Sequence, residues 1–121
     1  MAIPILKLGD TLIATVVTAL SDRDMIELRD ELAERVGRDR AKKVIVDVTA
    51  LDVLDSFATR TLRGLAATAR LRGAETAIVG IQPEVAFAMV QLGLTLDGVH
   101  TALDLEEGVA MLRKPRRGSV E

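Results

Sequence analysis

The run Val44, Ile45 and Val46 constrains the fold of this 121-residue chain more than any other feature. Together with Val48 it forms a nearly continuous β-branched apolar stretch that only Asp47 interrupts. Such a stretch is typical of a strand that is covered on both faces of a sheet, because a half-exposed strand alternates polar and apolar residues. The chain is therefore expected to pack helices against a sheet.

The remaining sequence predicts four more strands and four helices. Two β-rich runs at 3–8 and 11–17 are separated by two residues, which suits a tight hairpin. Further strands are predicted at 76–79 and 99–102, and apolar residues at helical spacing predict helices at 21–37, 56–72, 83–93 and from 104 onward. The order β-β-α-β-α-β-α-β-α indicates one α/β domain with a mixed sheet, flanked by about four helices.

Residues with known capping preferences mark the ends of the predicted helices. Ser21 is expected to cap the first helix, and Gly37 is expected to end it. Either Asp55 or Ser56 is the natural N-cap of the second helix. Pro83 suits the first position of the third helix, because its missing N–H group is not needed there.

Composition excludes several classes of function. Hydrophobic residues make up 49% and charged residues 28%, which allows a buried core in a protein that folds alone. Aromatic residues are only 2% and the net charge is −2, so no electrostatic footprint for a nucleic acid is visible. No apolar run approaches the roughly 20 residues that span a bilayer, and the absence of cysteine fits a reducing compartment. We therefore expect a cytoplasmic protein without nucleic-acid or membrane partners.

The segment "DVTALDVLDSF", residues 47–57, is the strongest candidate for a functional site. It follows the central strand and leads into a helix, and ligands of such sheets gather at this junction. A helix N-terminus would favour a phosphoryl group on Ser56, whereas Asp52 and Asp55 would repel it if they lie close. This arrangement describes a switch that changes a surface, but the sequence pattern alone favours simple helix capping by the same residues.

Catalytic and metal-binding alternatives find little support around this segment. A serine hydrolase needs a base beside its nucleophile, yet the only histidine is His100 and no Gly-x-Ser-x-Gly elbow occurs. The spacing of Asp47, Asp52 and Asp55 matches no EF-hand loop, so solvated loop acids are the favoured interpretation. Asp47 also superficially resembles the phosphoacceptor aspartate of a response-regulator receiver domain. The sequence has, however, neither an acidic pair after an early strand nor a lysine in a final strand. We therefore predict no catalytic residue, no metal site and no cofactor.

The third predicted helix, "PEVAFAMVQLG", is apolar nearly all round, which is more than one buried stripe requires. Either the helix is deeply buried or part of it forms an interface. The candidate interface consists of Gln82, Pro83, Glu84, Phe87 and Met89.

Four stretches spread over the chain resemble the STAS domain, the fold of anti-sigma-factor antagonists. They are "IPILKL" at 3–8, "DVLDSF" at 52–57, "GIQP" at 80–83 with "EVA" after it, and "TALDLEEG" at 101–108. Their combination is most similar to the small scaffold proteins of bacterial stressosomes. The resemblance places the STAS domain at 1–113, before a basic flexible tail at 114–121.

The resemblance implies a role for individual residues. Ser56 matches the phosphoacceptor serine of the family, and Asp52 and Asp55 match its acidic neighbours. Phe57 and Thr59 are expected to complete the surface around Ser56. The helix after the "GIQP" turn carries Ala88, where sensor-bearing relatives tend to have a threonine, and this leaves one expected switch site. The sequence "RRGS" in the tail resembles a basophilic kinase site at Ser119 only superficially.

The resemblance also implies the partners. They are a small serine kinase of the histidine-kinase ATPase type, sensor-bearing STAS proteins, a PP2C-like phosphatase that resets the switch, and further copies of the chain. Because ATP and Mg²⁺ sit on the kinase, this chain is expected to be a substrate rather than an enzyme. The alternatives are a free anti-sigma-factor antagonist outside any large assembly, and a STAS module that binds a small ligand. Calorimetry with nucleotides and size measurements with a sensor-bearing partner distinguish these alternatives.

Overall fold

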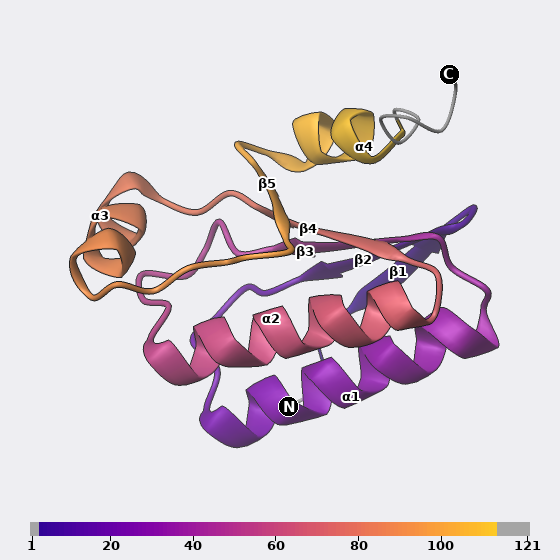
Figure 1. The fold of residues 1–121 in the computed structure, drawn as a ribbon, viewed down its shortest axis with the longest axis horizontal. Helices are drawn as coiled ribbons and strands as arrows, with labels where there is room; N and C mark the ends of the chain where they lie inside the picture. The colour runs from indigo at the N-terminus through magenta and orange to yellow at the C-terminus, as the bar shows by residue number, and fades with distance from the viewer. Residues whose placement is uncertain (1–2, 114–121) are drawn as a thin grey trace.

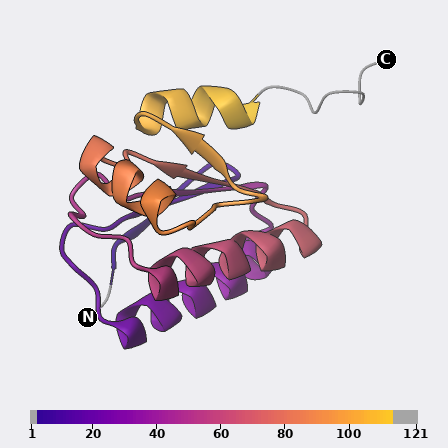
Figure 2. The same cartoon turned by 60° about the vertical axis from the view of Figure 1, so that its left-hand side comes forward.

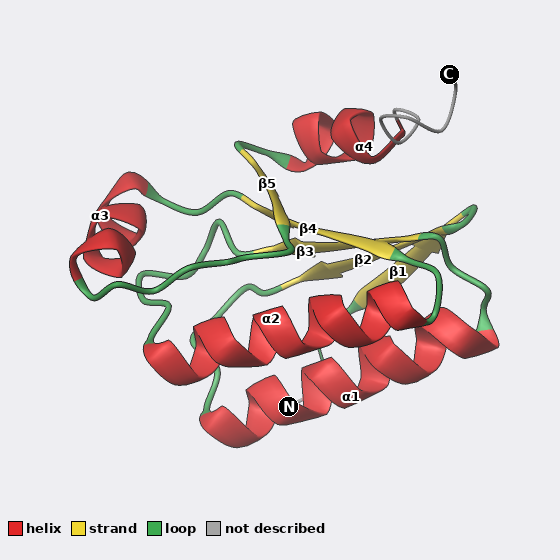
Figure 3. Ribbon diagram, in the orientation of Figure 1, coloured by secondary structure: helices red, strands yellow, loops and turns green. Residues whose placement is uncertain are grey.

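A computed structural model describes residues 3–113 of the chain. It confirms the predicted order of elements and the mixed sheet (Figures 1 and 3). The strands lie side by side in the order in which they occur in the sequence: β1 (Ile5–Leu8), β2 (Thr11–Thr15), β3 (Lys43–Asp47), β4 (Glu75–Val79) and β5 (His100–Ala102). Strands β1 and β2 are antiparallel, whereas β2 to β5 are parallel. The predicted tail at 114–121 lies outside the described residues.

Helices cover the two faces of the sheet unequally. The long helices α1 (Asp22–Arg38) and α2 (Ser56–Leu71) lie side by side on one face, and α4 (Leu105–Arg113) lies on the other (Figures 1 and 2). Helix α3 (Pro83–Gln91) lies at the end of the sheet where β3 and β4 finish and where α2 begins. The carboxyl ends of the central strands and the starts of two helices therefore share one end of the molecule.

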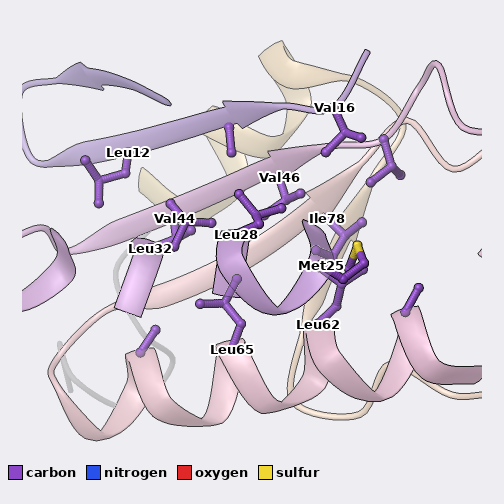
Figure 4. Packing of buried hydrophobic residues seen from close by; sticks show 14 of the residues in the cluster. Leu12, Val16, Met25, Leu28, Leu32, Val44, Val46, Leu62, Leu65 and Ile78 are labelled. Carbon is purple, nitrogen blue, oxygen red and sulfur yellow. The ribbon is translucent and has the colours of Figure 1, made fainter. Parts of the chain in front are cut away.

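The larger part of the core fills the space between the sheet and helices α1 and α2. Figure 4 shows leucines of both helices facing Val44 and Val46 of β3. The opposite side of β3 presents Ile45, which packs in a smaller cluster beneath α4. Because alternate residues of β3 enter different clusters, the strand is buried on both faces, as the β-branched run predicts.

Two glycines permit close packing of helices. A Cβ atom on Gly108 of α4 would lie 2.6 Å from Cγ1 of Val79, so the missing side chain lets α4 approach β4. A Cβ atom on Gly37 would overlap the guanidinium group of Arg72, which lies against α1. The prediction that Gly37 ends the first helix is wrong, because α1 continues to Arg38 and Gly37 instead provides room for a neighbouring side chain.

Candidate functional site

The segment between β3 and α2 is held by hydrogen bonds at its start. Oδ1 of Asp47 accepts hydrogen bonds from the backbone N–H of Thr49 at 2.9 Å and from its hydroxyl at 2.6 Å. This arrangement closes the first turn after the strand, because a short acidic side chain can bond the backbone two residues further on. Asp47 is therefore a structural turn residue.

The same turn is fixed to the connection between β4 and α3. The side-chain amide of Gln82 donates a hydrogen bond of 2.6 Å to the carbonyl oxygen of Thr49. Gly80 has a φ of +83°, and a Cβ atom there would lie 1.9 Å from Oγ1 of Thr49. Only glycine allows the backbone to pass this close in that conformation. Sequence reasoning missed this link, and the only local signal for it is the glycine directly after a buried strand.

Asp55 is the N-cap of α2, one of the two residues that the sequence predicts. Its carboxylate accepts a hydrogen bond of 2.8 Å from the backbone N–H of Ala58, while its backbone is extended. Capping by an aspartate satisfies a helix N–H group that has no partner within the helix. Ser56 is consequently the first residue of the helix, and it is exposed.

The hydroxyl groups near this end of the molecule differ in their availability. The hydroxyl of Thr59 donates to the carbonyl oxygen of Asp55 at 2.8 Å, and that of Thr61 donates to Phe57 at 2.8 Å. Both threonines are buried, Thr59 with an exposed fraction of 1%. Four residues between positions 49 and 61 carry a hydroxyl group, and those of the three threonines are hydrogen-bonded. Ser56 is exposed, and its hydroxyl makes no hydrogen bond to the described part of the chain.

The neighbours of Ser56 only partly match the predicted switch surface. Asp52 and Asp55 are exposed, and Phe57 is half-buried against the core. The expectation that Thr59 belongs to this surface is wrong, because its side chain points into the protein and bonds the preceding turn of the helix. Among residues 3–113, no group of three histidine or acidic side chains is close enough to hold a metal ion.

Helix α3 buries one narrow stripe and exposes the rest of its apolar surface. Val85 and Met89 pack into the core, whereas Phe87 is 71% and Val90 77% exposed. Leu92, which follows the helix, is 69% exposed. Met89, with an exposed fraction of 6%, is a core residue and not part of the candidate interface.

The rest of the candidate interface lies where α3 begins. Pro83 is the first residue of α3, and Gln82 is its N-cap residue without a side-chain hydrogen bond to the helix. Glu84 is exposed in the first turn. Because the Gln82 side chain bonds Thr49 instead, the start of α3 is connected to the segment that leads to Ser56.

Residues 2–108 match the family model of the STAS domain. The chain therefore belongs to the STAS domain family, which agrees with its mixed sheet and four helices. None of the helices described between residues 3 and 113 is long and apolar enough to cross a membrane.

Similar proteins include an RsbT co-antagonist, RsbS and a chain of a stressosome structure. The chain is 31% identical to RsbT co-antagonist protein RsbRA of Bacillus subtilis (strain 168) over 98 residues, which are 81% of this chain and 34% of that protein. It is 34% identical to the solved structure of Moorella thermoacetica RsbS with a serine-to-glutamate substitution, with a TM-score of 0.80 over 93% of this chain and 96% of that one. A structure described as the molecular architecture of the stressosome, a signal integration and transduction hub, is 35% identical over 91% of this chain and 96% of that chain, with a TM-score of 0.75.

The lengths of these relatives differ. The chain spans only about a third of the curated relatives that it matches, namely 34% of RsbRA and 29% of RsbRC of Bacillus subtilis. It spans nearly the whole of the two stressosome-related chains of known structure. The similarity to RsbRA and RsbRC is therefore a similarity of one domain.

Proposed function

We propose that this chain is a non-enzymatic scaffold and phospho-switch of the RsbS kind, which acts in the cytoplasm in bacterial stress signalling. In its unmodified form it associates with RsbR-like sensor-bearing STAS proteins and holds an RsbT-like serine kinase. Phosphorylation of Ser56 releases the kinase, and a PP2C-like phosphatase resets the switch. The similarity to RsbS and to RsbT co-antagonists supports the assignment of partners.

The availability of the Ser56 hydroxyl is the observation that carries the proposal. Ser56 is exposed at the start of α2, while the three threonines around it use their hydroxyl groups in internal hydrogen bonds. In the proposed transfer, Oγ of Ser56 forms a bond to the γ-phosphorus of ATP on the kinase, and the bond from that phosphorus to ADP breaks. The serine proton passes to a base in the complex of kinase and substrate. Asp55 supports this reaction by fixing the helix start, because its carboxylate already accepts the N–H of Ala58.

A charge at Ser56 is expected to change a surface without changing the fold. The added phosphate brings about −1.5 to −2 charges at neutral pH. The flanking segment is fixed by the Asp47 turn, the Gln82 hydrogen bond and the Asp55 cap, so the backbone has little freedom to rearrange. Release of the kinase then results from altered electrostatics at the contact.

Mass spectrometry tests this proposal directly. The chain is incubated with its cognate kinase and Mg-ATP, and the wild type is compared with Ser56→Ala and with the control Ser119→Ala, a serine outside the described residues. We expect one phosphate, which maps to Ser56, is lost in Ser56→Ala and is retained in Ser119→Ala. Phosphate incorporation into Ser56→Ala, or kinase binding that is unchanged by modification, would refute the switch.

The exposed apolar surface of α3 is the proposed contact for partner proteins. We define it as Phe87, Val90 and Leu92, with Gln82, Pro83 and Glu84 at its start. Exposed apolar residues that gather on one helix commonly mark a protein interface. Phe87→Ser is expected to weaken association with the kinase or with RsbR-like proteins in size-exclusion chromatography. Leu71→Ser is the matched control, because Leu71 is 89% exposed but lies at the far end of α2.

A further inference from the structure

The arginines of α2 and its C-cap differ in their hydrogen bonding. Arg63 donates to the hydroxyl of Thr95, Arg70 donates to the carbonyl oxygen of Gly98, and Arg72 donates to that of Ala33. Arg60 is exposed and has neither a hydrogen bond nor an ion pair with any residue in the described part of the chain. Arg60 is thus the arginine of this helix whose guanidinium group makes no hydrogen bond within the described part of the chain, whereas Arg63 and Arg70 bond neutral oxygen atoms.

The helical neighbours of Arg60 explain why it has no ion pair. Side chains three and four residues apart meet on a helix surface, which gives Arg60 the neighbours Ser56, Phe57, Arg63 and Gly64. None of these side chains is negatively charged, and Arg63 adds a like charge. Ser56 is the neighbour that can acquire a negative charge by modification.

We infer that Arg60 is the internal counter-charge of phosphorylated Ser56, which pairs with the phosphate across the first turn of α2. This inference rests on the proposed function of Ser56 and names a residue that regulates it. An anion four residues before a cation is the favourable orientation for a helical ion pair, because it also agrees with the helix dipole. Guanidinium groups bind phosphate oxygens through two parallel hydrogen bonds.

The ion pair would place the phosphate at a defined position relative to α2. The Asp52 and Asp55 side chains lie on the segment before the helix, whereas Arg60 lies one turn further along it. A phosphate attracted by Arg60 and repelled by these aspartates is held along the exposed side of α2. Phosphorylation then adds negative charge to the switch surface and at the same time removes the free guanidinium of Arg60 from it.

The second ionisation of the phosphate provides a direct test. Phosphoserine is inserted at position 56 during synthesis, without any kinase, and the phosphate is titrated by phosphorus NMR in the full chain. A neighbouring guanidinium stabilises the dianion, so the pKa of the phosphate should be lower in the wild type than in Arg60→Gln, by about 0.2–0.4 pH unit. Arg60→Lys should retain part of this difference, and added salt should reduce it.

Arg70→Gln is the matched control for the loss of one positive charge. Arg70 lies fourteen residues after Ser56, about 21 Å along the helix at 1.5 Å per residue. This variant should leave the phosphate pKa at the wild-type value. Equal pKa values in the wild type and Arg60→Gln, or an equal shift in Arg70→Gln, would overturn the inference. Because the phosphate is inserted without the kinase, a failure of the proposed kinase reaction would leave this result unaffected.

Discussion

Gly80, in the connection between β4 and α3, lies against Thr49, in the connection between β3 and α2. Replacement of Gly80 by alanine tests whether this contact holds the segment before Ser56. Gly80 has a φ of +83°, and the added Cβ atom would lie 1.9 Å from Oγ1, 3.0 Å from Cβ and 3.1 Å from Cα of Thr49. Rotation of the threonine side chain removes only the first of these contacts, and it breaks the 2.6 Å hydrogen bond to Asp47. The backbone of the segment must therefore move.

Gly73 provides a matched control for the backbone part of the cost. Its φ is +94°, yet a Cβ atom there would have no neighbour within 4 Å. In both variants the free energy of unfolding falls by about 1–2 kcal/mol, because an alanine is placed in a left-handed conformation. Gly80→Ala also bears overpacking of about 1–3 kcal/mol and the loss of a hydrogen bond to a carboxylate, worth about 1.5 kcal/mol. We expect Gly80→Ala to lower the free energy of unfolding by about 2.5–4.5 kcal/mol more than Gly73→Ala does.

Urea unfolding followed by far-ultraviolet circular dichroism measures this difference, since the chain has no tryptophan or tyrosine for fluorescence. A Thr49→Gly background removes the hydroxyl and Cβ atoms and leaves only the 3.1 Å contact with Cα, so the difference in cost between Gly80→Ala and Gly73→Ala should become much smaller. This double-mutant cycle isolates the contact. Equal losses for Gly80→Ala and Gly73→Ala in the wild-type background would refute the reasoning.

Further stability changes follow from the structure, each measurable by the same unfolding assay. Thr76→Val should stabilise the protein by about 1 kcal/mol, because the buried Thr76 hydroxyl has no hydrogen-bond partner in the described part of the chain; a loss of stability would contradict this. Gly64→Ala should stabilise α2 by about 1 kcal/mol, because an added Cβ atom would have no neighbour within 4 Å. Gly108→Ala should destabilise the protein, because its Cβ atom would lie 2.6 Å from Cγ1 of Val79. Asp55→Ala should cost about 1 kcal/mol through loss of the N-cap, and Asp55→Asn should restore most of it.

The fold was predictable because its determinants are local. The β-branched run at Val44 predicts a strand that is buried on both faces, and the structure places its alternate residues in two clusters. Ser21 forms the expected cap, where its hydroxyl accepts the backbone N–H of Asp24 at 3.1 Å. Gly37 was misinterpreted because a glycine near a helix end resembles a stop signal, and only the position of Arg72, far away in sequence, shows its role.

The candidate site was predictable in part, and its remaining features depend on contacts between distant residues. Asp55 and Ser56 follow from the capping pattern, but the hydrogen bond from Gln82 to Thr49 joins two connections that no local pattern relates. The burial of Thr59 could have been foreseen, since Leu62 and Ala66 follow it at helical spacing and both are buried. The apolar sequence of α3 was compatible with burial or with an interface, and only the packed fold shows that Phe87 and Val90 remain exposed.

The arrangement of the site explains how one modification could affect a partner without refolding the domain. Gln82 belongs to the start of α3 and bonds the segment that leads to Ser56, so the proposed α3 contact surface and the proposed phosphorylation site have a fixed relation. A partner that packs on Phe87 and Val90 would meet the start of α2 in a defined position. In this arrangement a charge on Ser56 would act on the bound partner directly, because hydrogen bonds of Asp47, Gln82 and Asp55 hold the backbone around it. We therefore expect a phosphorylated chain to lose affinity for its partner while its unfolding midpoint changes little.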